Sequence, residues 1–468
     1  MRPTVRIAFD LSLSGGGDFF TLDDPTKGEL DGTSFKLAGD ILTDVSDDVR
    51  SVDIRRGRSS ETSNVDAGSG RVTLDNRNRF YDPLASSSVS PYAPSILPRK
   101  EVTVEIGGNR QYTGIVEDWD LEYSPGGDSV TLVKLTDGLT LLNEDVLASG
   151  AGATGLSGSV IYQTASAVDW PLGRLNLDEG TASVGAHTLA RDTNALQYMQ
   201  KISNTEQALL FVDKDGSLRF RDRISPRRVM GTVFADDGSG IPFQNIEIVY
   251  GTEFLYTQIE IEYPSGSVSA TDTFQATASA IANYGVRKLN LSTFLSGSAA
   301  ASPIGDLLAD RYGEPTLRIV GLTIEVDSLT PAQQEEVLGL ELGDGVEVVF
   351  TPNGIGEPIQ RELAVDGISH NVSPGQHLMN VNLFEPVLLR RTGSVTGTSS
   401  TAGTVTGSPN LVGFASGSSS VSGNVAGVKG TFGVVTGSSG TTGTVSGTKL
   451  TSFVLDTSEL DSNDRLTA

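Results

Sequence analysis

The sequence contains no cysteine, which excludes disulfide bonds, thiolate metal sites and cysteine nucleophiles. This absence fits assembly in a reducing cytoplasm. Aromatic residues make up only 6% of the chain, and Trp119 and Trp170 are its two tryptophans. So few aromatic rings argue against shallow, aromatic-lined sugar grooves. No run of 18 apolar residues is present, so we expect no membrane-spanning helix.

Sequence motifs of catalysis are also missing. The chain has no His-Glu-x-x-His, no Walker-type Gly-Lys-Ser/Thr and no Gly-x-Ser-x-Gly. His370 and His377 lie on either side of a Ser-Pro-Gly turn, where they could face each other and bind a metal, but a polar role beside the turn is favoured. Residues 212–220, "VDKDGSLRF", lack the ligands of a complete calcium loop and predict a hairpin turn. We therefore predict a protein that is not an enzyme, with no catalytic residues, cofactor or metal.

Acidic residues are unevenly distributed. The net charge is −24, yet residues 387–455 contain no Asp or Glu and carry +4, so the remaining residues together carry −28. A basic footprint for nucleic-acid binding is therefore absent. The short basic clusters at 55–58 and 225–229 are expected to pair with acidic neighbours rather than with phosphate.

Residues 1–150 predict a first β-barrel domain. Apolar and charged residues alternate over 52–55, which is typical of a half-buried strand. Residues 101–122 predict a hairpin with Gly107-Gly108-Asn109 at its turn. Strands at this spacing are typical of a small barrel or sandwich.

Residues 151–315 predict a mixed α+β middle domain. Its first forty residues are rich in Gly, Ser and Ala. A helix should follow, with Asp192 as its N-cap and with Leu196, Met199 and Ile202 on one face. A second, short helix should begin near Pro303 and stop at Gly313.

Residues 316–388 predict a second β-barrel domain. Their strand–turn rhythm resembles that of the first domain, and both domains hold an Asp-Gly turn, at 137–138 and 366–367. The predicted fold class is therefore mainly β: two barrels flank a small α+β domain, and a glycine-rich β repeat follows.

Residues 389–450 form a decapeptide repeat, and residues 451–468 form an acidic C-terminal tail. The pattern Gly-x-Val-x-Gly recurs every ten residues, with Ala415 as the exception at the central position. The conforming positions are Gly393, Val395, Gly397, Gly403, Val405, Gly407, Gly423, Val425, Gly427, Gly433, Val435, Gly437, Gly443, Val445 and Gly447.

Because ten is even and a strand has a period of two, these glycines and valines fall on one strand face in every repeat. One valine in ten residues buries too little apolar surface to offset the ordering of a lone strand. We therefore predict that several copies of the chain meet here in an oligomeric β fibre or prism. A flexible linker is the alternative, but flexibility requires no fixed register.

An ordered set of short motifs resembles the minor tail proteins of long, non-contractile-tailed phages, especially those of actinobacterial hosts. The set runs through the arginine-rich 55–58, "TLDN" with "RFYDP" at 73–83, "PY" and "LP" within 91–98, "YTG" at 112–114 and "TDGL" at 136–139.

Two later stretches, 195–223 and 342–386, are similar to the middle domain and second barrel of the same family. The resemblance covers about residues 40–386 and implies a tail-tip or baseplate hub. Such hubs are homotrimers whose two barrels per subunit form a ring between the tail tube and the tip, and DNA passes through its centre. A threefold hub would bring three copies of the repeat together, so we expect residues 389–450 to form a trimeric spike or plug below it.

The resemblance also implies a location and partners. It places the chain at the tail tip of the virion, in contact with the distal tail protein or tail tube, the tape measure protein and other tip proteins, with the host envelope as a further candidate. In that setting the acidic charge suggests a channel whose carboxylates repel passing DNA.

Two other functions remain open. A receptor- or cell-wall-carbohydrate-binding tail protein is the main alternative, although the scarcity of aromatic residues disfavours it. A tail-associated cell-wall hydrolase would carry a hydrolase domain where this chain has its glycine repeat.

Overall fold

The computed structural model describes residues 2–9, 42–58, 61, 63–223, 230–266 and 268–386, together with seven strands between 391 and 456. The chain divides into two compact units, Met1–Val387 and Leu388–Ala468. In the described residues, no helix has both the length and the apolar character needed to cross a membrane.

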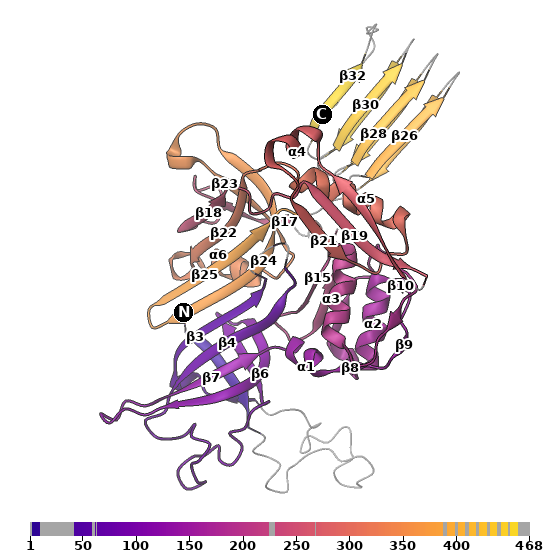
Figure 1. Cartoon of the computed structure of the whole chain (residues 1–468). Coiled ribbons are helices and arrows are strands. Elements are labelled where there is room, and N and C mark those ends of the chain that lie inside the picture. Colours follow the sequence, from indigo (N-terminus) through magenta and orange to yellow (C-terminus); the bar gives the residue numbers. More distant parts are fainter. Residues whose placement is uncertain are drawn as a thin grey trace, which may run out of the picture. The chain divides into compact units, whose positions relative to one another are not determined.

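The first unit is built on one thirteen-stranded sheet (Figure 1). Its strands, in spatial order, are β18 (Asn245–Val249), β22 (Arg318–Glu325), β25 (Gln376–Phe384), β24 (Ile359–Ser373), β3 (Val49–Gly57), β4 (Asp66–Asp75), β7 (Val130–Thr136), β6 (Asn109–Glu122), β5 (Glu101–Ile106), β1 (Pro3–Ala8) and β2 (Leu42–Asp44), while β23 (Gly345–Phe350) pairs with β24 and with β17 (Met230–Ala235).

The sheet joins the two regions that the sequence predicts as separate barrels. β3 pairs antiparallel with β24 from Val52 opposite Val372 to Gly57 opposite Gly367, and Figure 1 shows β3 and β4 beside β24 and β25. Through the described strands the pairing follows an open path from β18 to β2, and no closed barrel is found there. The mainly β class is confirmed, whereas the two closed barrels stay a prediction.

The predicted hairpin at 101–122 is confirmed. β5 pairs antiparallel with β6, with Val104 opposite Tyr112 and Ile106 opposite Asn109. The turn is formed by Gly107 and Gly108, which both have positive φ, a conformation that glycine adopts at little steric cost. Asn109, expected in the turn, is the first residue of the return strand.

Six helices are described in the first unit. They are α1 (Leu139–Glu144), α2 (Ser157–Ala167), α3 (Ala195–Glu206), α4 (Ala278–Tyr284), α5 (Ser298–Tyr312) and α6 (Pro331–Gly339).

Helix α3 is the predicted middle-domain helix, and it buries Leu196, Met199 and Ile202 as expected. The predicted N-cap is wrong. Asn194 caps the helix, because its side chain accepts a hydrogen bond from the Gln197 N–H, whereas Asp192 lies in the preceding turn with φ 58°. Both residue types are good caps, so the sequence alone left the starting residue open.

Three further helix predictions need correction. α5 begins at Ser298 and contains Pro303 rather than starting near it, although it ends before Gly313 as expected. α2 lies in the Gly/Ser/Ala-rich stretch where only connections were predicted. α6 interrupts the predicted all-β segment, where Thr330 and Gln333 form a capping box ahead of it.

Several small sheets complete the middle of the first unit. Two three-stranded sheets have the orders β11 (Leu175–Leu177), β16 (Leu218–Arg221), β15 (Leu209–Val212) and β20 (Val268–Gln275), β19 (Gln258–Ser265), β21 (Lys288–Ser292). Three short pairs are β8 (Val146–Leu147) with β14 (Thr193–Asn194), β9 (Gly150–Ala151) with β13 (Thr188–Leu189), and β10 (Gly155–Leu156) with β12 (Ser183–Val184).

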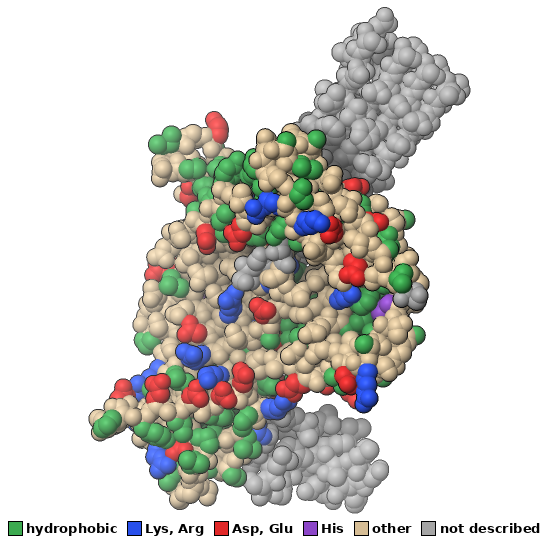
Figure 2. Space-filling model, in the orientation of Figure 1, with side chains coloured by type: hydrophobic (Ala, Val, Ile, Leu, Met, Phe, Trp, Pro, Cys, Tyr) green, Lys and Arg blue, Asp and Glu red, His purple; other side chains and the backbone are tan. Residues whose placement is uncertain are grey.

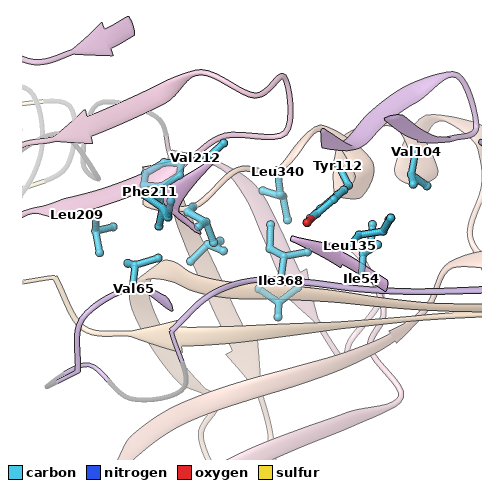
Figure 3. Close-up of a cluster of buried hydrophobic side chains, with 14 of the residues drawn as sticks. Ile54, Val65, Val104, Tyr112, Leu135, Leu209, Phe211, Val212, Leu340 and Ile368 are labelled. Carbon is cyan, nitrogen blue, oxygen red and sulfur yellow. The ribbon is translucent and has the colours of Figure 1, made fainter. Parts of the chain in front are cut away.

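One hydrophobic core runs from the large sheet into the middle region (Figure 3). Ile54 and Leu135 from the first half of the sheet lie beside Ile368 from β24, and the cluster continues to Phe211 of β15. Full burial of such side chains contributes about 1.5–3 kcal/mol each. This shared core joins the two halves of the sheet into one packed body. A separate small core lies between α5 and the β20–β19–β21 sheet.

The second unit consists of parallel strands that alternate between two sheets. One sheet has the order β26 (Arg391–Gly397), β28 (Leu411–Gly417), β30 (Thr431–Gly437), β32 (Leu450–Asp456), and the other has β27 (Thr401–Gly407), β29 (Val421–Gly427), β31 (Thr441–Gly447). Each strand therefore pairs with the strand two repeats away in the same chain. The companion strands that the sequence led us to expect from other chains are here other repeats of this chain.

Candidate functional site

The outer face of the large sheet carries a polar row that crosses from one half of the unit to the other. Successive strand pairs place Asn371 opposite Asp53, Asp53 opposite Arg71, Arg71 opposite Lys134, and Lys134 opposite Asp118. Cross-strand neighbours on one face are close enough to interact directly. Each charge in this row therefore has a polar or oppositely charged residue nearby.

Contacts within the row confirm this arrangement. The Asn371 amide donates to Asp53 Oδ1 at 2.5 Å. Lys134 Nζ lies 2.8 Å from Asp120 Oδ2 and 3.4 Å from Asp118 Oδ2. These are exposed pairs, which typically contribute little to stability. Because they place opposite charges side by side, these pairs keep the net charge of the face low.

The row lies in a shallow hollow of about 530 Å³. The polar residues that line it are Asp53, Arg55, Ser69, Arg71, Glu117, Lys134, Ser369, His370, Asn371 and Asn380. Figure 2 shows acidic and basic side chains interspersed in the region where Figure 1 places β7 and β6. A surface of this kind is polar and nearly balanced in charge.

Two buried ion pairs lie just inside this face, where β3 meets β24. Arg56 Nη1 lies 2.6 Å from Glu341 Oε1, and Arg58 Nε lies 2.5 Å from Asp366 Oδ1. Burial raises the pKa of Glu341, but the Arg56 guanidinium outweighs it and holds that pKa below its usual value. Burial raises the pKa of Asp366, which Arg58 only partly offsets. The expectation that 55–58 pairs with acidic neighbours is therefore confirmed for both buried arginines.

A second set of ion pairs surrounds Glu61. Its two carboxylate oxygens contact Arg311 at 2.7 Å and Arg318 at 2.9 Å. A separate ion pair joins Arg221 to Asp344, with Arg221 Nη1 2.7 Å from Asp344 Oδ1. No sequence signal marked these acidic residues as partners, because they lie more than a hundred residues from the arginines that they contact. The other basic cluster, 225–229, lies outside the described residues.

The two histidines of the β24–β25 hairpin face each other, as the sequence allowed. His370 Nδ1 lies 3.0 Å from His377 Nε2, and both rings are buried. Burial lowers the pKa of His370 well below its usual value and lowers that of His377 to about 4, with Asp327 opposing the shift at His377. Within the described residues, no group of three His, Cys, Asp or Glu side chains is placed to hold a metal. The geometry fits a neutral hydrogen-bonded pair.

The two predicted Asp-Gly turns have different structures. Asp137 is buried after β7, where its carboxylate accepts hydrogen bonds from the Gly68 and Leu139 N–H groups, and burial raises its pKa to about 7. The turn predicted at Asp366-Gly367 is wrong, because these residues form an irregularity inside β24. At 212–220 the hairpin is confirmed: Asp213 accepts hydrogen bonds from the Asp215 and Ser217 N–H groups.

The repeat residues fall into in-register columns. One column holds Gly393, Gly413 and Gly433, and the neighbouring sheet aligns Val405, Val425 and Val445. The remaining predicted positions follow the same alignment: Val395 with Val435, Gly397 with Gly437, Gly403 with Gly423 and Gly443, and Gly407 with Gly427 and Gly447. Their role as the core of a trimer stays a prediction.

Three solved structures show what the chain is similar to. A tail protein from Neisseria meningitidis MC58 matches with a TM-score of 0.51 and 14% identity, covering 75% of this chain and 95% of that one. The 43 kDa tail protein of prophage MuSo2 from Shewanella oneidensis matches with 0.49 and 15%, covering 75% and 97%. Prophage tail protein gp18 from Listeria monocytogenes EGD-e matches with 0.43 and 10%, covering 82% and 95%.

No protein-family model and no curated protein sequence matches the chain. At these low identities the likeness establishes the fold alone, and it rests on the Neisseria protein, whose TM-score exceeds 0.5. Over the 75% of the chain that this match covers, the fold is therefore that of a solved tail protein.

Proposed function

We propose that this chain is a structural, non-enzymatic hub protein at the tail tip of a tailed bacteriophage. It assembles as a homotrimer in the host cytoplasm, contacts the tail tube and other tip proteins, and forms a ring through which DNA passes. The observation that carries the proposal is the fold. One thirteen-stranded sheet spans both halves of the first unit, and 75% of the chain matches 95% of a solved tail protein.

The two halves of the sheet are proposed to act as the two hub domains of each subunit. β3 and β24 hold them together with the buried ion pairs Arg56–Glu341 and Arg58–Asp366. Because the halves share one core, they would move as one body. Three such subunits would present six similar halves around the ring, as the sequence resemblance implies.

The polar face of the sheet is proposed to line the DNA path. The row described above holds carboxylates beside Arg71 and Lys134, and its cations are already close to acidic neighbours. Paired cations attract phosphate weakly, so DNA would slide along the wall rather than adhere to it. On this face we propose a charge-balanced wall in place of the acidic, DNA-repelling channel that the sequence suggested, with the excess acidity of the chain elsewhere.

Stoichiometry tests the proposal. Native mass spectrometry or light scattering on the full-length protein should give a mass about three times 49.1 kDa. Electron microscopy of the virion should then show threefold density at the tail tip. A stable monomer in solution, together with any other symmetry at the tip, would refute the hub.

DNA adhesion tests the wall separately. Full-length protein should not retain duplex DNA at physiological salt. A variant with Asp118→Lys and Asp120→Lys should retain it, with an affinity that falls as salt rises. DNA retention by the unmodified protein would count against the proposed wall while leaving the trimer untouched.

A further inference from the structure

A second concave site lies away from the polar face, beside helix α3, and we call it the α3 pocket. Its volume is about 530 Å³, within the range of roughly 300–1,000 Å³ in which proteins bind small ligands. Its walls come from Glu61, Ser63 and Asn64 after β3, helix α3, the end of β16, strand β21 and the end of α5. The polar residues that could contact a ligand are Glu61, Gln197, Gln200, Lys201, Asn204, Gln207, Arg223 and Arg311.

One wall is a stripe of carboxamides. Gln197, Gln200, Asn204 and Gln207 follow one another at spacings of three, four and three residues, so they share one face of α3 and its C-terminal end. Gln200 and Asn204 bond to Asn64, which fixes their orientation. Carboxamides both donate and accept hydrogen bonds, as sugar hydroxyls require of a binding site.

Two cations add positive charge to the pocket. Lys201 is half-buried, with its ammonium 4.3 Å from the centre of the Phe294 ring, and Glu262 is the carboxylate whose charge acts on it. Arg223 is half-buried, and its Nη1 atom is buried without a hydrogen-bond partner. Buried donors normally have partners, so each such atom calls for an explanation.

Carboxylates offset part of this charge. Glu61 uses both oxygens on Arg311 and Arg318, and the charges of Glu206 and Asp222 act on Arg223. Arg311 nevertheless keeps a buried Nε without a partner. A bound anion would satisfy these donors and offset the desolvation of the guanidinium groups.

We propose that the α3 pocket binds a sugar that carries an anionic group, through the carboxamide stripe and the cations Lys201 and Arg223. The anion is a carboxylate, as in a uronic acid, or a phosphate, as in the sugar phosphates of cell-wall polymers. A compact pocket suits one or two sugar rings. An extended acidic peptide is the less favoured occupant, because peptides bind along strand edges or long grooves. This inference does not depend on the hub role.

Calorimetry on the full-length protein tests the proposal with glucuronic acid, glucose 6-phosphate, glucose and inorganic phosphate. At least one of the two anionic sugars should bind saturably, and at least tenfold more tightly than glucose or inorganic phosphate. The stronger of the two identifies the anion. Absence of saturable binding by both would overturn the proposal, as would equal binding of inorganic phosphate or tighter binding of a tetra-glutamate peptide.

Variants locate the site. Lys201→Gln and Arg223→Gln should each weaken binding about tenfold, and Gln197→Ala, at an exposed position, about threefold. Arg191→Gln removes an exposed cation that does not line the pocket, so it should leave binding unchanged. Thermal unfolding midpoints identify any variant that fails to fold. If the half-buried Lys201 and Arg223 variants do not fold, the exposed Gln197→Ala variant still tests the site. Unchanged affinity in the folded pocket variants would exclude this site.

Discussion

Gly57 and Gly367 lie opposite each other where β3 meets β24. A Cβ atom on Gly57 would lie 2.3 Å from the Asp366 carbonyl oxygen and 2.6 Å from the Gly367 Cα. Gly57 also has φ 98°, a conformation that other residues rarely adopt. Two halves of the sheet therefore meet at a point where neither backbone leaves room for a side chain.

Replacing Gly57 tests how much this close approach matters. Gly57→Ala should lower the free energy of unfolding by about 3 kcal/mol or more, because a backbone clash adds to the conformational strain. Gly108→Ala is the matched control: its φ is 81°, and a methyl group there would meet no atom within 4 Å. It should cost only about 1 kcal/mol. Equal losses in chemical denaturation would show that the close approach contributes nothing.

The buried pair Arg56–Glu341 gives a second prediction. Arg56→Met leaves the Glu341 carboxylate buried without its cation, so the free energy of unfolding should fall by about 3–5 kcal/mol. Adding Glu341→Leu should recover much of that loss, because the unpaired charge is then gone. Arg99→Ala, which breaks an exposed pair with Glu144, should change stability little. Denaturant titration measures all four proteins, and a small effect of Arg56→Met would contradict the assigned role.

The histidine pair predicts a pH dependence. Because the folded-state pKa of His377 is about 4, below the usual 6.5, the unfolded chain binds more protons between these values. The contribution of His377 to stability is therefore present above pH 6.5 and is lost as pH falls towards 4, by roughly 2–3 kcal/mol at pH 4.5. His377→Gln should reduce this slope in unfolding measurements. An unchanged slope would show that the ring titrates normally.

Asp137 should change stability with pH in the direction opposite to His377. Its pKa is raised to about 7 from 3.8, so the folded chain binds the extra proton and this contribution is lost as pH rises from about 4 to 7. Asp137→Asn removes that titration, and stability should then increase more steeply with pH over this window. Comparing the slopes of the Asp137→Asn and His377→Gln proteins separates the two groups. A flatter slope in Asp137→Asn would contradict the assignment.

The strand pairing within the repeat predicts which deletions the second unit tolerates. Each strand pairs with the strand twenty residues away, so deleting residues 411–430 removes one strand from each sheet and preserves the alignment of the others. Deleting 411–415 breaks the ten-residue spacing instead. Limited proteolysis should leave a resistant C-terminal fragment in the first deletion and digest it in the second. Equal digestion of both, and of the unmodified protein, would favour the flexible linker.

Local patterns in the sequence predicted much of the secondary structure. The alternation at 52–55, the Gly107-Gly108 turn and the buried stripe of α3 all follow from periods of two and 3.6 residues. The ten-residue repeat likewise indicated strands. The sequence predicted helix positions less accurately. The start of α3 was misplaced because Asp192 and Asn194 are both acceptable caps, and α2 was missed because it begins in a stretch rich in Gly and Ser.

The sequence by itself determined the mainly β class, the strand face that the Gly and Val residues of each repeat share, and the pairing of Arg56 and Arg58 with acidic partners. Only the tertiary structure decided which acidic residues these are, how β3 joins β24 in one sheet, and that α3 lines a pocket. Those features depend on contacts between residues hundreds of positions apart, such as Arg56 and Glu341. Periodicity and propensity act over one or two turns, so they carry no information about such distant pairs.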